Sequence, residues 1–124
     1  MTSQSSSREL ILGERVTGTE VFNEAGEHIG ELDDLLIHKT SGKVVYALMS
    51  FGGFLGMGEK VHPLPWEVLR YDTAKDGYVV PINKEALKNA PSLDLDNIDE
   101  LGSDAAWNLQ LHEYYSPYGA KPYR

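Results

Sequence analysis

Cysteine is absent from the 124 residues, and basic residues are scarce: 11 Lys and Arg stand against 19 Asp and Glu, a net charge of −8. Without cysteine the chain cannot build a disulfide scaffold, a cysteine-based zinc site or a thiol catalyst. The shortage of Lys and Arg argues against nucleic acid as a partner, because affinity for phosphate backbones comes mostly from those residues. We expect one domain that can bury a core without a metal or a disulfide.

Long apolar runs are absent too. Near the N-terminus only Leu10, Ile11 and Leu12 are consecutive apolar residues, whereas a secretory signal needs about 7 to 15 and a membrane span about 18. We therefore expect a cytoplasmic protein with no direct membrane insertion. Residues 1–9, which hold four serines, are interpreted as a disordered leader.

The chain does contain a series of short β-rich segments separated by glycine and turn residues. Gly30 and a change of phase after Leu32 predict a bulge or bend within the second segment. Pro63 and Pro65 exclude a central strand, so we place residues 61–66 at an edge or in a turn. Segments at this spacing favour a barrel or sandwich over a parallel sheet. The predicted strands span residues 16–22, 28–37, 43–49, 69–72 and 78–82.

The pattern becomes helical near Asn83, which is a good N-cap for a short helix over residues 84–89. A second helix is predicted from residue 104 to about residue 115, with Ser103 as its cap. Its apolar stripe consists of Trp107, Leu111, Tyr114 and Tyr115, at spacings typical of one helix face, and we expect this stripe to pack on the β domain. Residues 116–124 show no periodicity and are expected to form a tail.

No catalytic or metal-binding motif is complete. Gly53 and Gly58 have the spacing of a phosphate-binding loop, but Glu59 occupies the position of its lysine. The four histidines have no metal-ligand spacing. Asp33 and Asp34 could serve as an acid–base pair, but adjacent residues of a strand point to opposite faces, so we expect them not to converge. We therefore expect no enzyme activity, no catalytic or metal-binding residues and no cofactor.

Acidic residues are concentrated in two stretches without Lys or Arg. Six lie between residues 16 and 38, and six more lie between residues 94 and 113. Such stretches indicate either solvated faces or an acidic docking surface.

The glycine-rich run at residues 52–60, followed by Pro65 and Trp66, resembles the PRC-barrel family. That family includes the cytoplasmic barrel of the photosynthetic reaction centre H subunit and the C-terminal barrel of the ribosome-maturation factor RimM. The match spans residues 10–91 and is most similar to the small stand-alone bacterial members. The resemblance implies a mainly β fold, a compact barrel of about six strands used as a docking module, without catalytic residues. Residues 92–124 are then an acidic helical extension and a tyrosine-rich tail.

We expect a non-catalytic protein-interaction or adaptor module that binds an unidentified protein and forms a homodimer. Tyrosine is favoured at interfaces, and four of the seven tyrosines lie in residues 114–124. A small-ligand or ion-binding barrel, or an accessory factor to photosynthetic electron transfer, stays open as the alternative. A deep polar pocket would favour this alternative, and a core filled by Val, Leu and Ile would count against it. The candidate interaction residues are Phe54, Leu55, Trp66, Trp107, Tyr114, Tyr115 and Tyr118.

Overall fold

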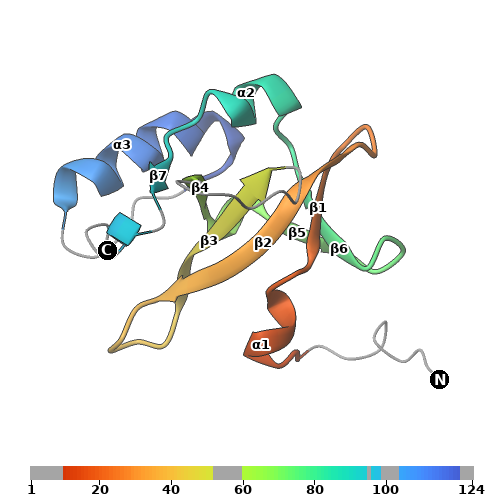
Figure 1. Cartoon of the computed structure of the whole chain (residues 1–124), viewed down its shortest axis with the longest axis horizontal. Helices are drawn as coiled ribbons and strands as arrows, with labels where there is room; N and C mark the ends of the chain where they lie inside the picture. Colours follow the sequence, from red (N-terminus) through yellow and green to blue (C-terminus); the bar gives the residue numbers. More distant parts are fainter. Residues whose placement is uncertain (1–9, 52–59, 95, 99–103, 121–124) are drawn as a thin grey trace.

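The computed structural model describes residues 10–51, 60–94, 96–98 and 104–120 (Figure 1). Seven strands form one sheet in the order β5-β6-β1-β2-β3-β4-β7. Every pairing is antiparallel except that of β1 with β6, which is parallel. Among the described residues β5 and β7 are the two ends of the sheet and do not pair with each other, so the expected barrel is an open sheet with seven strands rather than about six. The strands are β1 (Glu20–Asn23), β2 (His28–Ile37), β3 (Val44–Phe51), β4 (Lys60–Pro65), β5 (Arg70–Asp72), β6 (Gly77–Val80) and β7 (Leu93–Asp94).

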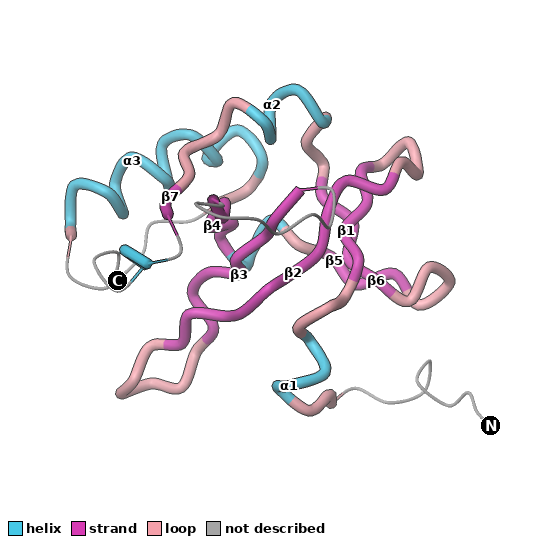
Figure 2. Tube along the Cα trace, in the orientation of Figure 1, coloured by secondary structure: helices cyan, strands magenta, loops and turns pink. Residues whose placement is uncertain are grey.

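The helices lie around the sheet rather than between its strands. Figure 2 shows α2 and α3 together on the side of β4 and β7, whereas α1 lies apart from them, near the N-terminus. The helices are α1 (Gly13–Val16), α2 (Lys84–Lys88) and α3 (Ala105–Tyr115), with short 3-10 turns η2 (Trp66–Val68) and η4 (Ser116–Tyr118).

The first strand is shorter than predicted. Residues 13–16 form the helical turn α1, and β1 begins only at Glu20. The Thr17 and Thr19 hydroxyls donate to the backbone carbonyls of Glu14 and Arg15, which holds this segment in a helical turn. β-branched residues had suggested a strand over residues 16–22, but local side-chain hydrogen bonds prevail over that propensity.

The predicted bulge in β2 is confirmed. Leu32 pairs with Met49 and Asp34 with Leu48, so Asp33 is one extra residue against β3. Gly30 is required by close packing of the two strands, because a Cβ atom there would lie 2.1 Å from the Ser50 carbonyl oxygen. The bulge and the glycine together shape the centre of the sheet.

The proline-containing segment is a strand, β4, in an edge position. β4 pairs with β3 over residues 62–65, whereas β7 pairs only with Lys60 and Val61. Alternate residues of a strand direct their N–H groups to opposite sides, and proline has no N–H to donate. Pro63 and Pro65 therefore fit the part of β4 that has no outer neighbour.

The core is apolar and includes the C-terminal helix. β3 is buried on both faces over residues 46–50, as its continuous apolar run predicted. Leu111 and Tyr115 of α3 are fully buried in the same cluster as Val21 and Leu64 of the sheet. Helix α3 is therefore part of the packed core.

The two predicted helices are present with small changes at their ends. The Asn83 side chain accepts a hydrogen bond from the Ala86 N–H and caps α2, as expected. α3 begins at Ala105, and Asp104 rather than Ser103 is the cap, since its carboxylate accepts from the Trp107 N–H. The expected irregular tail begins with a further turn, η4, and Tyr118 packs against the core.

Candidate functional site

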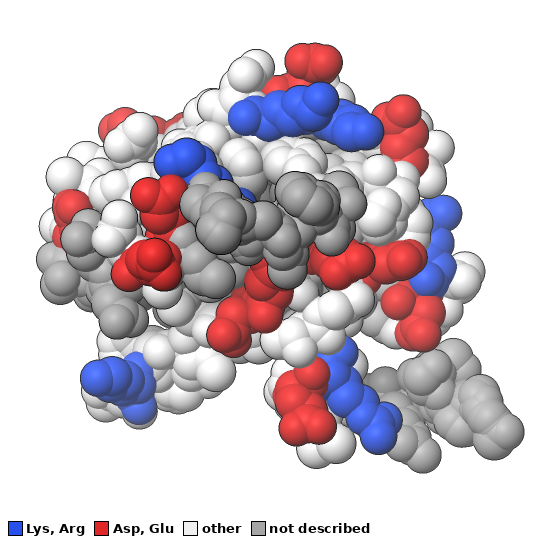
Figure 3. All heavy atoms as spheres, in the orientation of Figure 1, with Lys and Arg blue, Asp and Glu red and all other residues white. Residues whose placement is uncertain are grey.

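Three neighbouring strands place two carboxylates and a hydroxyl in one row. Glu20 on β1 lies directly opposite Glu31 on β2, and Glu31 lies directly opposite Ser50 on β3. Directly opposed residues of antiparallel strands project from the same face and lie about 5 Å apart, so like charges there are destabilising. Figure 3 shows a band of acidic side chains across this face, over β2 and β1.

The bulge adds two further carboxylates to this row. Asp34 lies opposite Leu48, on the same face as Glu31 and Ser50. Partial burial raises the pKa of Asp33 above its ordinary value of 3.8, and the neighbouring charges of Glu31 and Asp34 add to the rise. The expectation that Asp33 and Asp34 lie apart is wrong, because the extra residue breaks the alternation of the strand. We name Glu20, Glu31, Asp33 and Asp34 the acidic face.

Few cations compensate the acidic face. In the described part of the chain Glu31, Asp33 and Asp34 form no ion pair, and the remaining member, Glu20, lies 4.0 Å from the ring nitrogen of the exposed His28. Lys75 lies 5.4 Å from the centre of the Phe22 ring, where its charge faces the aromatic ring. Within the described residues the acidic face thus carries negative charge that no Lys or Arg ion pair offsets.

The Ser50 hydroxyl lies at the β3 end of this row, next to the acidic face. The residue is only 3% exposed, and its Oγ has no hydrogen-bond partner among the residues described. Ser50 is close enough to Asp33 to lower the pKa of that carboxyl, although the effect of burial is larger and raises it. The positions of the two groups do not satisfy the geometry of a hydrogen bond. An unpartnered buried hydroxyl costs about 1 to 3 kcal/mol. Sequence reasoning did not identify Ser50 as a site residue, although a serine within an apolar strand was an available signal.

The aromatic interaction candidates occupy different environments. Trp66 begins η2, is half-buried and packs edge-on against Tyr78 with ring centres 5.6 Å apart. Tyr115 is fully buried, so it belongs to the core rather than to the surface. Trp107 and Tyr118 are half-buried against that core. Phe54 and Leu55 lie outside the described residues.

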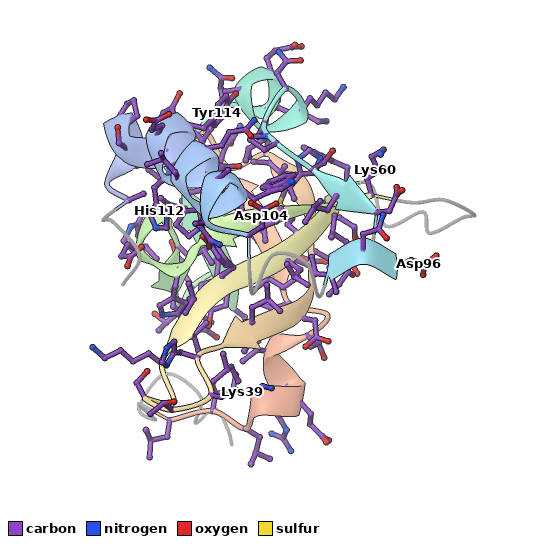
Figure 4. The ribbon with its side chains drawn as sticks, turned by 90° about the vertical axis from the view of Figure 1, so that its left-hand side faces the viewer. Lys39, Lys60, Asp96, Asp104, His112 and Tyr114 are labelled. Atoms are coloured by element: carbon purple, nitrogen blue, oxygen red, sulfur yellow. The ribbon has the colours of Figure 1, made fainter. Side chains whose placement is uncertain are left out.

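Hydrogen bonds join α3 to the rest of the fold. The Tyr114 hydroxyl donates to the Ala86 carbonyl oxygen at 2.6 Å, and Figure 4 shows Tyr114 on the side of α3 near α2. The buried Asn108 accepts a hydrogen bond from the Tyr46 hydroxyl of β3 and donates to the Asp104 carbonyl at 2.8 Å. Sequence reasoning missed Asn108, whose poor helix propensity within α3 was the available signal. These contacts hold the predicted apolar stripe against the sheet.

His62 is the one buried histidine of the described chain, at 7% exposure. Its ring packs edge-on against Phe51, with ring centres 4.9 Å apart. Burial lowers the pKa of His62 below its ordinary value of 6.5, and the backbone carbonyls of Ala90 and Pro91 partly offset this effect. His62 therefore lies buried in its neutral form, near the backbone of the segment after α2.

We expect the free energy of unfolding to fall as the pH drops below 6.5, because the unfolded chain then binds a proton that folded His62 resists. His62→Gln, which keeps an N–H donor, should reduce this pH dependence, measured by urea unfolding between about pH 7.5 and about pH 5. His28→Gln, at an exposed histidine, is the matched control and should behave as wild type. If the free energy of unfolding of His62→Gln fell as steeply with decreasing pH as that of the wild type, His62 would not be the group responsible for the pH dependence.

The described residues contain no group of three or more His, Cys, Asp or Glu side chains placed to hold a metal ion. Within the same residues, no helix has the length and apolar character needed to cross a membrane. The chemistry that this surface can offer is the binding of positive charge by carboxylates.

Comparison with known protein families matches residues 9–87 to the PRC-barrel domain. A comparison with curated proteins finds no matching relative. The matched segment covers all strands from β1 to β6 and most of α2, and it contains the whole acidic face. The chain belongs to the PRC-barrel domain family.

Proposed function

We propose that this protein is a non-catalytic interaction module that self-associates. The observation that carries this proposal is the apolar segment before α1, where Leu10, Ile11 and Leu12 are 89%, 53% and 62% exposed. Single exposed apolar residues are common, but adjacent ones form a patch of the kind that marks protein interfaces. A second copy of the chain offers the same patch, so a symmetric dimer would bury it.

One further observation supports a binding role over the alternative of a ligand-binding barrel. The sheet interior is filled by residues such as Val21, Leu32, Met49 and Leu64, which are completely buried. Such a core counts against a deep polar pocket for a small ligand. No observation favours a role in photosynthetic electron transfer.

The absence of cysteine agrees with a reducing, cytoplasmic location, which we include in the proposal.

The test replaces the segment by serine in the variant Leu10→Ser, Ile11→Ser, Leu12→Ser. We expect light scattering to give a dimer mass for the wild type and a monomer mass for the variant, because the apolar area that drives association is lost. Leu109→Ser is the control, since Leu109 is 61% exposed but stands alone on α3. This control should keep the dimer mass.

A monomeric wild type at high protein concentration would exclude self-association. A dimer that persists in the triple-serine variant would exclude this segment as its interface. Circular dichroism of all three proteins checks that the fold is unchanged, and we expect no difference because the replaced side chains are exposed.

A further inference from the structure

We propose that the acidic face binds a basic segment of a partner protein, with an arginine side chain of that segment held between Glu31 and Asp33. This adds a partner class to the proposed interaction function. It uses residues other than Leu10–Leu12, so it does not depend on self-association.

The first argument is the charge arrangement across the strands. Glu20 and Glu31 are direct cross-strand neighbours, a pairing that destabilises a sheet when both residues carry the same charge. Asp33 adds a partly buried carboxylate beside Glu31. None of the described Lys or Arg side chains pairs with these three carboxylates. Such an arrangement is unfavourable in the free protein and becomes favourable when a cation binds.

The second argument is the Ser50 hydroxyl. It projects from β3 on the same face as Glu31. The residue is only 3% exposed, and its hydroxyl has no hydrogen-bond partner among the described residues. Stability alone would favour alanine here, because an unpartnered buried hydroxyl is costly. A small movement of Asp33 toward a bound cation would let Ser50 donate to that carboxylate. The hydroxyl would then hold Asp33 in its binding orientation.

The third argument distinguishes arginine from a metal ion. The carboxylates of the described residues form no group of three placed around one metal position. A guanidinium is planar and presents five N–H donors, so it can bind two separate carboxylates at once. The bulge places Glu31 and Asp33 beside each other, and no third carboxylate of the described residues completes a metal site with them.

The experiment measures binding of a short oligo-arginine peptide by isothermal titration calorimetry at physiological ionic strength. The site variant is Glu31→Gln, Asp33→Asn, and the control is Glu67→Gln, Glu113→Gln, which removes the same charge from exposed positions on other elements. We expect the site variant to weaken binding about tenfold or more and the control less than about twofold. Ser50→Ala should weaken binding severalfold while the protein stays folded.

Equal weakening by the site variant and the control would overturn the proposal, because binding would then follow the net charge of −8 rather than a site. Binding of Ca²⁺ or Mg²⁺ that is lost in the site variant, with no peptide binding, would also overturn it in favour of a metal ion. Thermal unfolding separates these outcomes from misfolding. The site variant should unfold at the same or a higher temperature than wild type, since a partly buried, repelled charge has been removed.

Discussion

Gly30→Ala is expected to destabilise the protein by about 3 kcal/mol or more. The added Cβ atom would lie 2.1 Å from the Ser50 carbonyl oxygen and 3.1 Å from the Ser50 carbonyl carbon. Both atoms belong to the backbone of β3, so relief requires the two central strands to separate. A domain of this kind is stable by only about 5 to 15 kcal/mol in total, which makes the effect large.

Urea unfolding monitored by tryptophan fluorescence measures this change. Gly13→Ala is the matched control, because a Cβ atom at Gly13 meets nothing within 4 Å and the residue lies in a helical turn. The control should be neutral or slightly stabilising, since alanine favours helix. Similar unfolding midpoints for the two variants would mean that β2 and β3 are not packed as described.

The second large effect is expected for Leu111→Ala, which should lower the free energy of unfolding by about 3 kcal/mol. Leu111 is fully buried between α3 and the sheet, in one cluster with Val21 and Leu64. Its truncation would remove apolar contacts and leave a cavity that the surrounding rigid strands cannot fill.

Leu109→Ala supplies the control on the same helix. Leu109 is 61% exposed, so its truncation should change the unfolding free energy by less than about 0.5 kcal/mol. A small effect for Leu111→Ala as well would show that α3 contributes little to the core. Two separate unfolding transitions in the wild type would indicate that the helix unfolds independently of the sheet.

Local signals in the sequence were sufficient for much of the fold. Asn83 as N-cap and Glu85 in the first turn predicted α2, and the Asn83 side chain accepts a hydrogen bond from the Ala86 N–H, three positions along the chain. The turn at residues 74–77 and the β-rich residues around it likewise predicted the β5–β6 pair. The family resemblance is confirmed over residues 9–87. By contrast, residues 16–19 were predicted as strand but precede β1, because β propensity does not register the hydrogen bonds that Thr17 and Thr19 make to the preceding turn.

Only the residue types of the candidate site could be predicted from the sequence, not their arrangement. The acidic stretch was visible in the sequence, but the opposition of Glu20 to Glu31 depends on strand register, which no local pattern specifies. The placement of Asp33 and Asp34 on one face depends on the bulge, whose position relative to β3 is a property of the pair of strands. Ser50 becomes significant only when its burial and its neighbour Glu31 are both known.

The parallel pairing of β1 with β6 has a consequence for how the chain folds during synthesis. Val21 must pair with Tyr78, so β1 cannot acquire its second neighbour until most of the chain has left the ribosome. β1, β2 and β3 are joined by short turns and can pair as soon as they emerge. Until β6 arrives, the outer edge of β1 is an open strand edge, with Glu20 on β1 itself and the other three carboxylates of the acidic face on the neighbouring β2. Mutual repulsion of that charge opposes the pairing of one nascent chain with another, so we expect the acidic face to protect the unfinished chain from aggregation.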